Sequence, residues 1–326
     1  MIDSDETPLF AETTPWEDVQ GRLEALGLGD GLPLVPPTAR RMERMLAGVA
    51  QPERSYGPVP PLFGDLTAGA VAYQCVLAGC LPAELPIVLT AVAACLEPQF
   101  NLLGIQTTTG TPTVAVIVHG SITCTLGMNA KGNCLGPGNR ANACIGRAVR
   151  LALTNIGGAR PGIGDMATMG QPGKYTFCFA ESGSASLPSL AARRDLADSQ
   201  GAVTVLGVSG TMEVLPLAGD ATPLAALRPL AAAVRGAQRA GSADRTRPAA
   251  EQFLLMPLEI FDLFEKAGWT LADIQAGMAR ALSEAEVACS AEDIHPVLTG
   301  GAGIKMTYLP LWSGGTRSVT AELLRP

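Results

Sequence analysis

The apolar positions of the N-terminal half form long stretches rather than stripes. Residues 65–96 are rich in Ala, Val and Leu and are interrupted by Gly79 and Pro82. A helix that is apolar nearly all round has no face for solvent, so this stretch predicts two buried helices. Capping residues and the spacing of apolar positions predict further helices at 15–26, 38–48, 139–154, 223–239, 258–267 and 270–282.

Short runs of β-branched residues lie between the predicted helices. We expect strands at 102–106, 113–118, 174–181 and 202–208, with short strands around Val297 and Val319. Because helices and short strands alternate, the pattern predicts an α/β or α+β fold, in which a mixed β-sheet is covered by helices and the N-terminal part is largely helical. No internal repeat of 20 to 50 residues is evident.

Three segments are expected along the 326 residues, of which 47% are apolar. An N-terminal helical segment covers residues 1–56, a central α/β core covers 57–240, and helices and strands in 241–326 complete the core. The second boundary rests on residues 241–248, the most linker-like stretch of the chain.

The charge balance limits the classes of partner. Acidic residues outnumber basic ones by 30 to 23, and the net charge of −7 argues against nucleic-acid binding. Charged residues, Gly or Pro interrupt each apolar stretch before the roughly 20 residues of a membrane span, so no membrane association is expected. The acidic start lacks the features of a secretory signal, which predicts a cytoplasmic protein. The apolar composition predicts self-association into an oligomer.

Histidine and cysteine usage gives no sign of a metal or a cofactor. His119 and His295 have no ligand spacing, and each is expected to be structural or at the surface. The eight cysteines lack the short regular spacing of a disulfide scaffold, which favours free thiols. The chain also lacks the P-loop pattern and the dinucleotide fingerprint.

A glycine-rich turn that leads into a predicted helix is the most informative segment. Gly136, Gly138 and Asn139 would leave free backbone N–H groups at the positive end of the helix dipole, which favours an anion. Arg140 and Arg147 would add positive charge and hold a carboxylate or phosphate. The same residues are equally consistent with a plain cap on a buried helix.

Two more glycine-rich turns lie near the C-terminus, at 299–305 and 314–318. They carry Lys305 and Arg317, and successive backbone amides in such turns can bind an anion. For each turn alone, a hairpin is the usual explanation. Together with Arg140, in an otherwise acidic chain, they predict a small anionic substrate if the three turns share one cavity.

Thiol chemistry is the second candidate. The predicted strand 174–181 alternates with period two, which places Lys174 and Cys178 on one face, where an ammonium group would favour the thiolate. Glu181 at the strand end could serve as a general acid or base. Cys134 precedes a helix N-terminus, an environment that also lowers a thiol pKa. In the alternative, Cys178 fills space below a helix and Glu181 is solvated.

Several blocks of the sequence form a recognisable set. They are 30–38 (DGLPLVPPT), 78–82 (AGCLP), 100–102 (FNL), 136–147, 155–162 (NIGGARPG), 173–181 (GKYTFCFAE) and the two C-terminal glycine-rich turns. Together these blocks resemble a bacterial family of undefined activity that is associated with the UGSC (seleno)proteins, named for a selenocysteine- or cysteine-Gly-Ser-Cys motif. The resemblance spans most of the chain.

The resemblance implies that Cys134 stands where the family usually carries another small residue. This chain lacks the UGSC motif itself, so a thiol or selenol partner would have to come from another polypeptide. The residues that fall in the family's characteristic blocks are Arg140, Asn142, Arg147, Lys174, Cys178 and Glu181.

These features predict an enzyme that acts on a small anionic metabolite by thiol-assisted lyase, transferase or hydrolase chemistry. Cys178, Lys174, Glu181 and Cys134 would be catalytic, and the glycine-rich turns with their cations would bind the substrate. The alternative, from a different class, is a non-catalytic ligand-binding subunit that completes the active site of a thiol or selenol partner.

Overall fold

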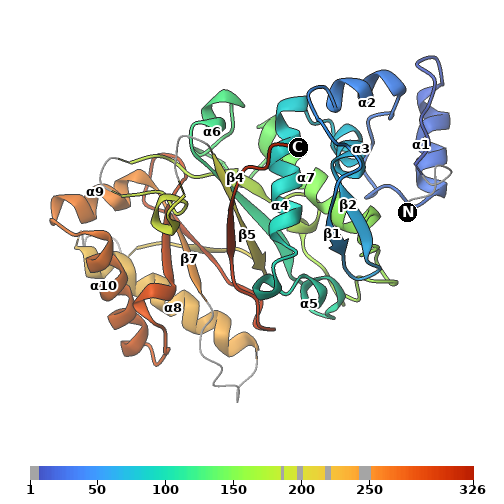
Figure 1. Ribbon diagram of the computed structural model, residues 1–326. Helices are drawn as coiled ribbons and strands as arrows, with labels where there is room; N and C mark the ends of the chain where they lie inside the picture. Colours follow the sequence, from blue (N-terminus) through green and yellow to red (C-terminus); the bar gives the residue numbers. More distant parts are fainter. Residues whose placement is uncertain (1–6, 185–186, 197–200, 217–221, 242–250) are drawn as a thin grey trace.

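Two four-stranded sheets pack face to face, and helices cover the outer face of each (Figure 1). The computed structural model describes residues 7–184, 187–196, 201–216, 222–241 and 251–326. It has the mixed α/β architecture that the sequence predicts. The first sheet has the strand order β10-β5-β3-β4, and the second has the order β6-β9-β7-β8.

The N-terminal part is largely helical and supplies the layer over the first sheet. Thr38 and Thr67 start α2 and α3 with side chains that accept a backbone N–H, and Gly79 ends α3 in the left-handed conformation. The elements of this part are α1 (Trp16–Ala25), α2 (Ala39–Met45), β1 (Ser55–Val59), β2 (Gly64–Thr67), α3 (Ala68–Ala78), α4 (Leu85–Ala94), α5 (Leu102–Thr107), α6 (Ile122–Thr125) and α7 (Arg140–Asn155).

The central strands of the two sheets are buried on both faces, whereas Glu213 and Glu322 on the edge strands are exposed. In β3, Val116 and Val118 face the helices, whereas Ala115 and Ile117 face the second sheet. The first sheet consists of β3 (Thr113–His119), β4 (Cys178–Ala180), β5 (Ala202–Val208) and β10 (Val319–Glu322). The second consists of β6 (Met212–Val214), β7 (Gln252–Met256), β8 (Ile294–Leu298) and β9 (Met306–Leu309), covered by α8 (Pro223–Gly241), α9 (Leu258–Lys266) and α10 (Leu271–Glu284).

The two sheets share one topology. In each, a central strand (β3 or β7) pairs with a parallel strand on one side (β4 or β8) and with an antiparallel strand on the other (β5 or β9). The fourth strands are exchanged. β6 follows β5 but pairs with β9, whereas β10 follows β9 but pairs with β5.

A pair of matching hydrogen bonds marks the place where the exchanged strands cross. Ser209 N–H donates to Pro310 O, and Trp312 N–H donates to Gly207 O, both at 2.8 Å. The strand registers make these two bonds equivalents of each other. The strands of two units, 113–214 and 252–322, are therefore related by approximate twofold symmetry. Such units are longer than a repeat of 20 to 50 residues.

Two predicted strands differ from the structure. Residues 102–106 lie in helix α5, because the side chain of Asn101 accepts the Gly104 N–H and so starts a helix. Of residues 174–181, only Cys178–Ala180 form a strand, since Pro172 begins a 3₁₀ turn that includes Lys174. The strands predicted at 113–118 and 202–208 are confirmed as β3 and β5.

The predicted segment boundaries do not coincide with the units of the structure. β1 runs across the boundary between residues 56 and 57. Strand exchange joins the chain on either side of the boundary between residues 240 and 241, and residues 242–248 of the predicted linker lie outside the described residues.

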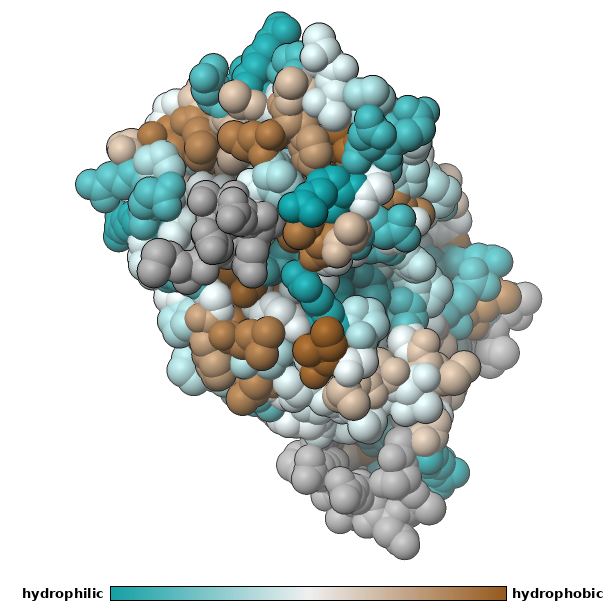
Figure 2. All heavy atoms as spheres, turned by 90° about the vertical axis from the view of Figure 1, so that its right-hand side faces the viewer, coloured by the Kyte–Doolittle hydropathy of each residue, from teal (hydrophilic) through white to brown (hydrophobic). Residues whose placement is uncertain are grey.

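The apolar composition is accounted for mainly by the interior, where three clusters of buried hydrophobic residues fill the spaces between layers. On the face shown in Figure 2, small hydrophobic patches lie among hydrophilic side chains. Among the described residues, no single helix is long and apolar enough to cross a membrane. Pro82–Ala94 and Pro98–Thr107 are long and apolar enough only when taken together, and the two are bent by 76° relative to each other.

Candidate functional site

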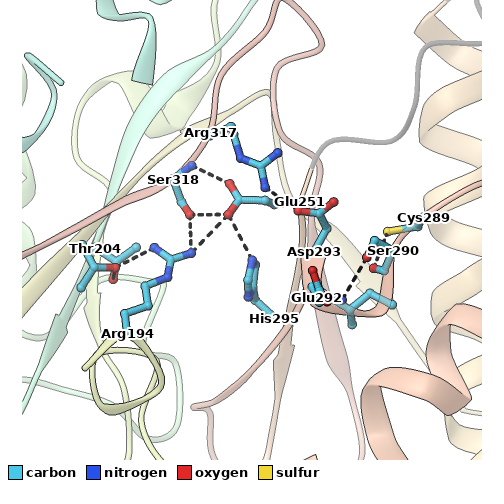
Figure 3. Close-up of polar contacts among 12 residues, drawn as sticks. Arg194, Thr204, Glu251, Cys289, Ser290, Glu292, Asp293, His295, Arg317 and Ser318 are labelled. Carbon is cyan, nitrogen blue, oxygen red and sulfur yellow. Dashed lines mark hydrogen bonds and ion pairs between the residues drawn. The ribbon is translucent and has the colours of Figure 1, made fainter. Parts of the chain in front are cut away.

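A cluster of polar and charged side chains interrupts the hydrophobic layer between the two sheets; Figure 3 labels Arg194, Thr204, Glu251, His295 and Ser318 from it. We call it the inter-sheet cluster. Its centre is fully buried, since His119 and Thr204 are 1% and 0% exposed. Its members are His119, Glu181, Arg193, Arg194, Thr204, Glu251, His295, Ser318 and Thr320.

The alternation of the strands directs these side chains inward. His119 ends β3 on the same face as Ile117, and Glu181 is the first residue after β4. Thr204 and Thr320 are opposite each other on β5 and β10, and their hydroxyl oxygens are 2.8 Å apart. Strand exchange thus places a side chain of β10 in the middle of the cluster.

A chain of hydrogen bonds passes through the imidazole of His119. Its Nδ1 is 2.7 Å from Glu181 Oε2, and its Nε2 is 2.7 Å from Thr204 Oγ1. At the far end, Arg194 Nη1, which can only donate, bonds to Thr320 Oγ1 at 2.7 Å. If His119 is neutral and Glu181 ionised, all donors point one way, from Arg194 through both hydroxyl groups and the imidazole to Glu181.

The same chain can accept a proton on His119. The imidazolium would donate from Nε2 to Thr204, and the Thr204 hydroxyl would turn to donate to Thr320. Only hydroxyl rotations separate the two states, so both protonation states of His119 keep their hydrogen bonds. An imidazole that loses none of its own hydrogen bonds on gaining a proton is suited to a site of proton transfer.

Glu181 is held in a fixed orientation beside an arginine. Its Oε2 accepts from His119 and from Leu190 N–H, the latter at 2.9 Å. Its Oε1 lies 3.5 Å from Arg193 Nη2, which donates to Pro296 O at 2.7 Å. Arg193 Nε and Nη1 are buried without an acceptor among the described residues. Burial lowers the pKa of Arg193, and the nearby Glu181 offsets this shift only in part. Arg193 therefore offers two N–H groups to an anion beside the carboxylate of Glu181.

The second part of the cluster is internally paired. Glu251 Oε1 accepts from Arg194 Nη2 at 3.2 Å and from His295 Nε2 at 3.1 Å. Ser318 N–H donates to Glu251 Oε2 at 2.6 Å. Burial opposes ionisation of Glu251, but these bonds outweigh it and hold its pKa at about 2. This part positions Arg194 and carries no unmatched charge.

The predicted cations are engaged in ion pairs, and they do not meet in one cavity. Arg147 donates from Nε to Asp30 Oδ2 at 2.7 Å and from Nη2 to Asp30 Oδ1 at 2.8 Å. The other three cations also pair with carboxylates, namely Arg140 with Glu84, Lys305 with Glu213, and Arg317 with Asp293. Arg317 lies beside the inter-sheet cluster in Figure 3. By strand register, Lys305 and Arg317 lie at opposite ends of the second sheet.

The first glycine-rich turn serves as a helix cap. Asn139 accepts the Asn142 N–H with its side chain, and so begins α7. The buried amide of Asn142 holds the turn by accepting from Asn129 N–H and donating to the carbonyls of Asn129 and Cys134. Gly136 and Gly138 lie in the exposed part of the turn. The turn meets the second one, where Gly300 N–H donates to Ala130 O, but the third turn bonds to Gln99 instead.

The thiols lie away from the predicted ammonium partner. Cys178 faces α7 and the helical layer, and burial raises its pKa, so it is a thiol rather than a thiolate. Lys174 bonds to Asp165 at 2.7 and 2.8 Å. Cys134 is buried between the sheets and accepts from Thr299 Oγ1 at 3.4 Å. Of the four predicted catalytic residues, Glu181 alone is a member of the inter-sheet cluster.

Sequence reasoning missed most of the inter-sheet cluster. One signal was present: alternation along 113–119 puts His119 on the same face as Ala115 and Ile117, hence inside the molecule. Arg193, Arg194, Thr204 and Glu251 have no motif in their vicinity. Among the described residues, no three His, Cys, Asp or Glu side chains are grouped so as to hold a metal ion.

No family model matches this chain. No curated protein matches it either. Among solved structures, the chain is similar to a cyanuric acid hydrolase from A. caulinodans, with 14% identity over 63% of this chain and 68% of that chain, and a TM-score of 0.23. A likeness at this level shows nothing about the function of this chain.

Proposed function

We propose that this chain is an enzyme that moves a proton on a small anionic metabolite within the inter-sheet cluster. The observation that carries the proposal is the juxtaposition of two features. Glu181 is bonded to an imidazole that keeps its hydrogen bonds in either protonation state, and the adjacent Arg193 has buried N–H groups without an acceptor.

Each group has a role in this proposal. Arg193 Nε and Nη1 bind the anionic group of the substrate, most simply a carboxylate. Glu181 Oε1 takes a proton from the substrate, and Oε2 stays bonded to His119 and Leu190. His119 is a positioning residue that holds Glu181 Oε2 and is itself held by Thr204. Cys178 has no part in the reaction, because it faces the helical layer as a buried thiol.

Hydrogen–deuterium exchange into a panel of small carboxylates tests the proposal without knowledge of the product. The panel consists of oxo acids and dicarboxylates with an acidic C–H, incubated with the protein in D₂O and followed by NMR. We expect exchange into one class. Glu181→Gln should slow it by about 100-fold or more, because a general base typically contributes that factor. Arg193→Gln should raise the concentration for half-saturation.

Matched variants separate these roles from general damage. Glu17→Gln and Arg44→Gln change exposed residues and should leave exchange unaltered. His119→Asn keeps a donor for Glu181 but cannot become charged, so it should alter the pH profile of exchange. Saturable binding of a panel member without any exchange would overturn the enzymatic proposal and favour the ligand-binding subunit. Unchanged exchange in Glu181→Gln would remove this carboxylate from the reaction.

A further inference from the structure

A second buried polar cluster lies at the opposite end of β3 from His119. It joins three elements: Gln106 from α5, Arg150 from α7, and Asp165 and Lys174 from the segment between α7 and β4. Thr113 at the start of β3 fixes this segment, since its hydroxyl donates to Gly173 O at 3.2 Å. The cluster is separate from the residues of the proposed function.

One carboxylate in this cluster serves two cations. Lys174 Nζ donates to both oxygens of Asp165, at 2.8 and 2.7 Å. Arg150 Nη2 donates to Asp165 Oδ2 at 2.8 Å. The ammonium group has a third N–H, which neither of these bonds uses.

The cluster therefore carries an excess positive charge in a largely buried place. The side chains of Arg150, Asp165 and Lys174 are 12%, 7% and 15% exposed. Among the described residues, Asp165 is the one carboxylate paired with either cation. A buried charge without a counter-charge is unfavourable, whereas a bound anion would balance it. The partial exposure of Lys174 leaves a route for a small ion.

Gln106 provides an independent sign of an absent acceptor. Its Oε1 accepts from Arg150 Nη1 at 3.2 Å, and because Arg150 can only donate, the amide cannot be turned the other way round. The Nε2 group must then point away from Arg150. It is buried, in a residue that is 2% exposed, and has no hydrogen-bond partner among the described residues. Buried amide groups normally find a partner, so this one points to a ligand.

We propose that Gln106, Arg150 and Lys174 form a binding site for a small oxyanion, that is, a carboxylate or a phosphate group. The anion accepts from Gln106 Nε2 and from the third N–H of Lys174, and its charge balances that of Arg150. Asp165 holds the two cations apart and in place.

Thermal unfolding in the presence of inorganic phosphate or of acetate, each at constant ionic strength and pH, tests the site. We expect a saturable rise in Tm with at least one of them, since binding to the folded state alone stabilises it. The anion that gives the rise assigns the class. Lys174→Met removes the excess charge and one donor. It should therefore raise the half-saturating concentration of the anion by about tenfold or more. Isothermal titration of the same proteins checks the affinity directly.

Gln106→Glu gives the sharpest outcome. The new carboxylate would face Arg150 and balance the charge, so this variant should have a higher Tm without added anion and no further rise with it. Gln51→Glu adds the same charge at an exposed position and should keep the response to the anion. The proposal is overturned if neither anion acts on the wild type, or if Gln106→Glu responds as the wild type does. All titrations are repeated in the Arg193→Gln background, which removes the anion-binding group of the proposed function, so that a failure of one proposal can be told from a failure of the other.

Discussion

Glu251 is the residue on which the pH dependence of stability should depend most clearly. Hydrogen bonds from His295 and Ser318 outweigh its burial and hold its pKa at about 2, against an ordinary 4.5. Because the folded pKa is the lower one, its contribution to stability is complete above about pH 4.5 and is lost as the pH falls toward 2. One pKa unit is worth about 1.4 kcal/mol, so the contribution is roughly 3 kcal/mol.

We therefore expect Glu251→Gln to lower the free energy of unfolding at pH 7 by roughly 3 kcal/mol, and the difference from wild type to shrink markedly at pH 3. Urea denaturation at the two pH values measures it. Glu17→Gln, at an exposed position, serves as the control. A difference for Glu251→Gln that is the same at both pH values would contradict the assignment.

At the level of single residues, local pattern predicted some roles and long-range pairing hid others. Glu181 was predicted as an acid–base residue because it ends a strand, and the structure places its carboxylate beside an imidazole and a guanidinium. Its role stays a prediction. Glu181 and Thr204, the partners of His119, lie 62 and 85 residues away along the chain. No spacing rule can reveal such pairs.

At the level of elements, caps were more informative than composition. Thr38, Asn139 and Thr270 start helices as predicted, because each side chain accepts a backbone N–H of the first turn. The β-branched run at 102–106 misled, since Asn101 caps that segment as a helix. The predicted alternation holds around Cys178 but not at Lys174, which lies in a turn, and the covering of Cys178 by a helix is the alternative interpretation, which the structure bears out.

The contact between α7 and β4 depends on a glycine. A Cβ atom on Gly146 would lie 2.4 Å from Thr176 Oγ1 and 2.7 Å from Phe177 N. Gly146→Ala should therefore destabilise the protein by roughly 1–3 kcal/mol, in spite of the better helix propensity of Ala. Gly236 in α8 is the matched control: with nothing within 4 Å of its Cβ position, Gly236→Ala should stabilise by up to about 1 kcal/mol. Urea denaturation compares the two, and equal effects would refute the close packing.

At the level of the whole molecule, exchange of β6 and β10 explains why the chain cannot be cut into the segments that composition suggests. Each sheet contains one strand that belongs, by sequence, to the other unit. The mixed fold class follows from local patterns of helices and strands. The strand exchange does not follow from local patterns, because the pairing of β5 with β10 joins residues that lie more than 100 positions apart.

Strand exchange predicts that the two sheets unfold together. Val319 in β10 is 6% exposed and packs in the core of the first sheet. Val319→Ala should lower the free energy of unfolding by roughly 1–3 kcal/mol. Hydrogen exchange of the slowest amides in β5 and β7, followed by mass spectrometry in increasing urea, measures each sheet separately. Because β6 joins the second sheet to the first unit, we expect the free energy of opening to fall by the same amount for both sets of amides. If only the amides of β5 lost protection, the two sheets would open independently, and strand exchange would not couple them.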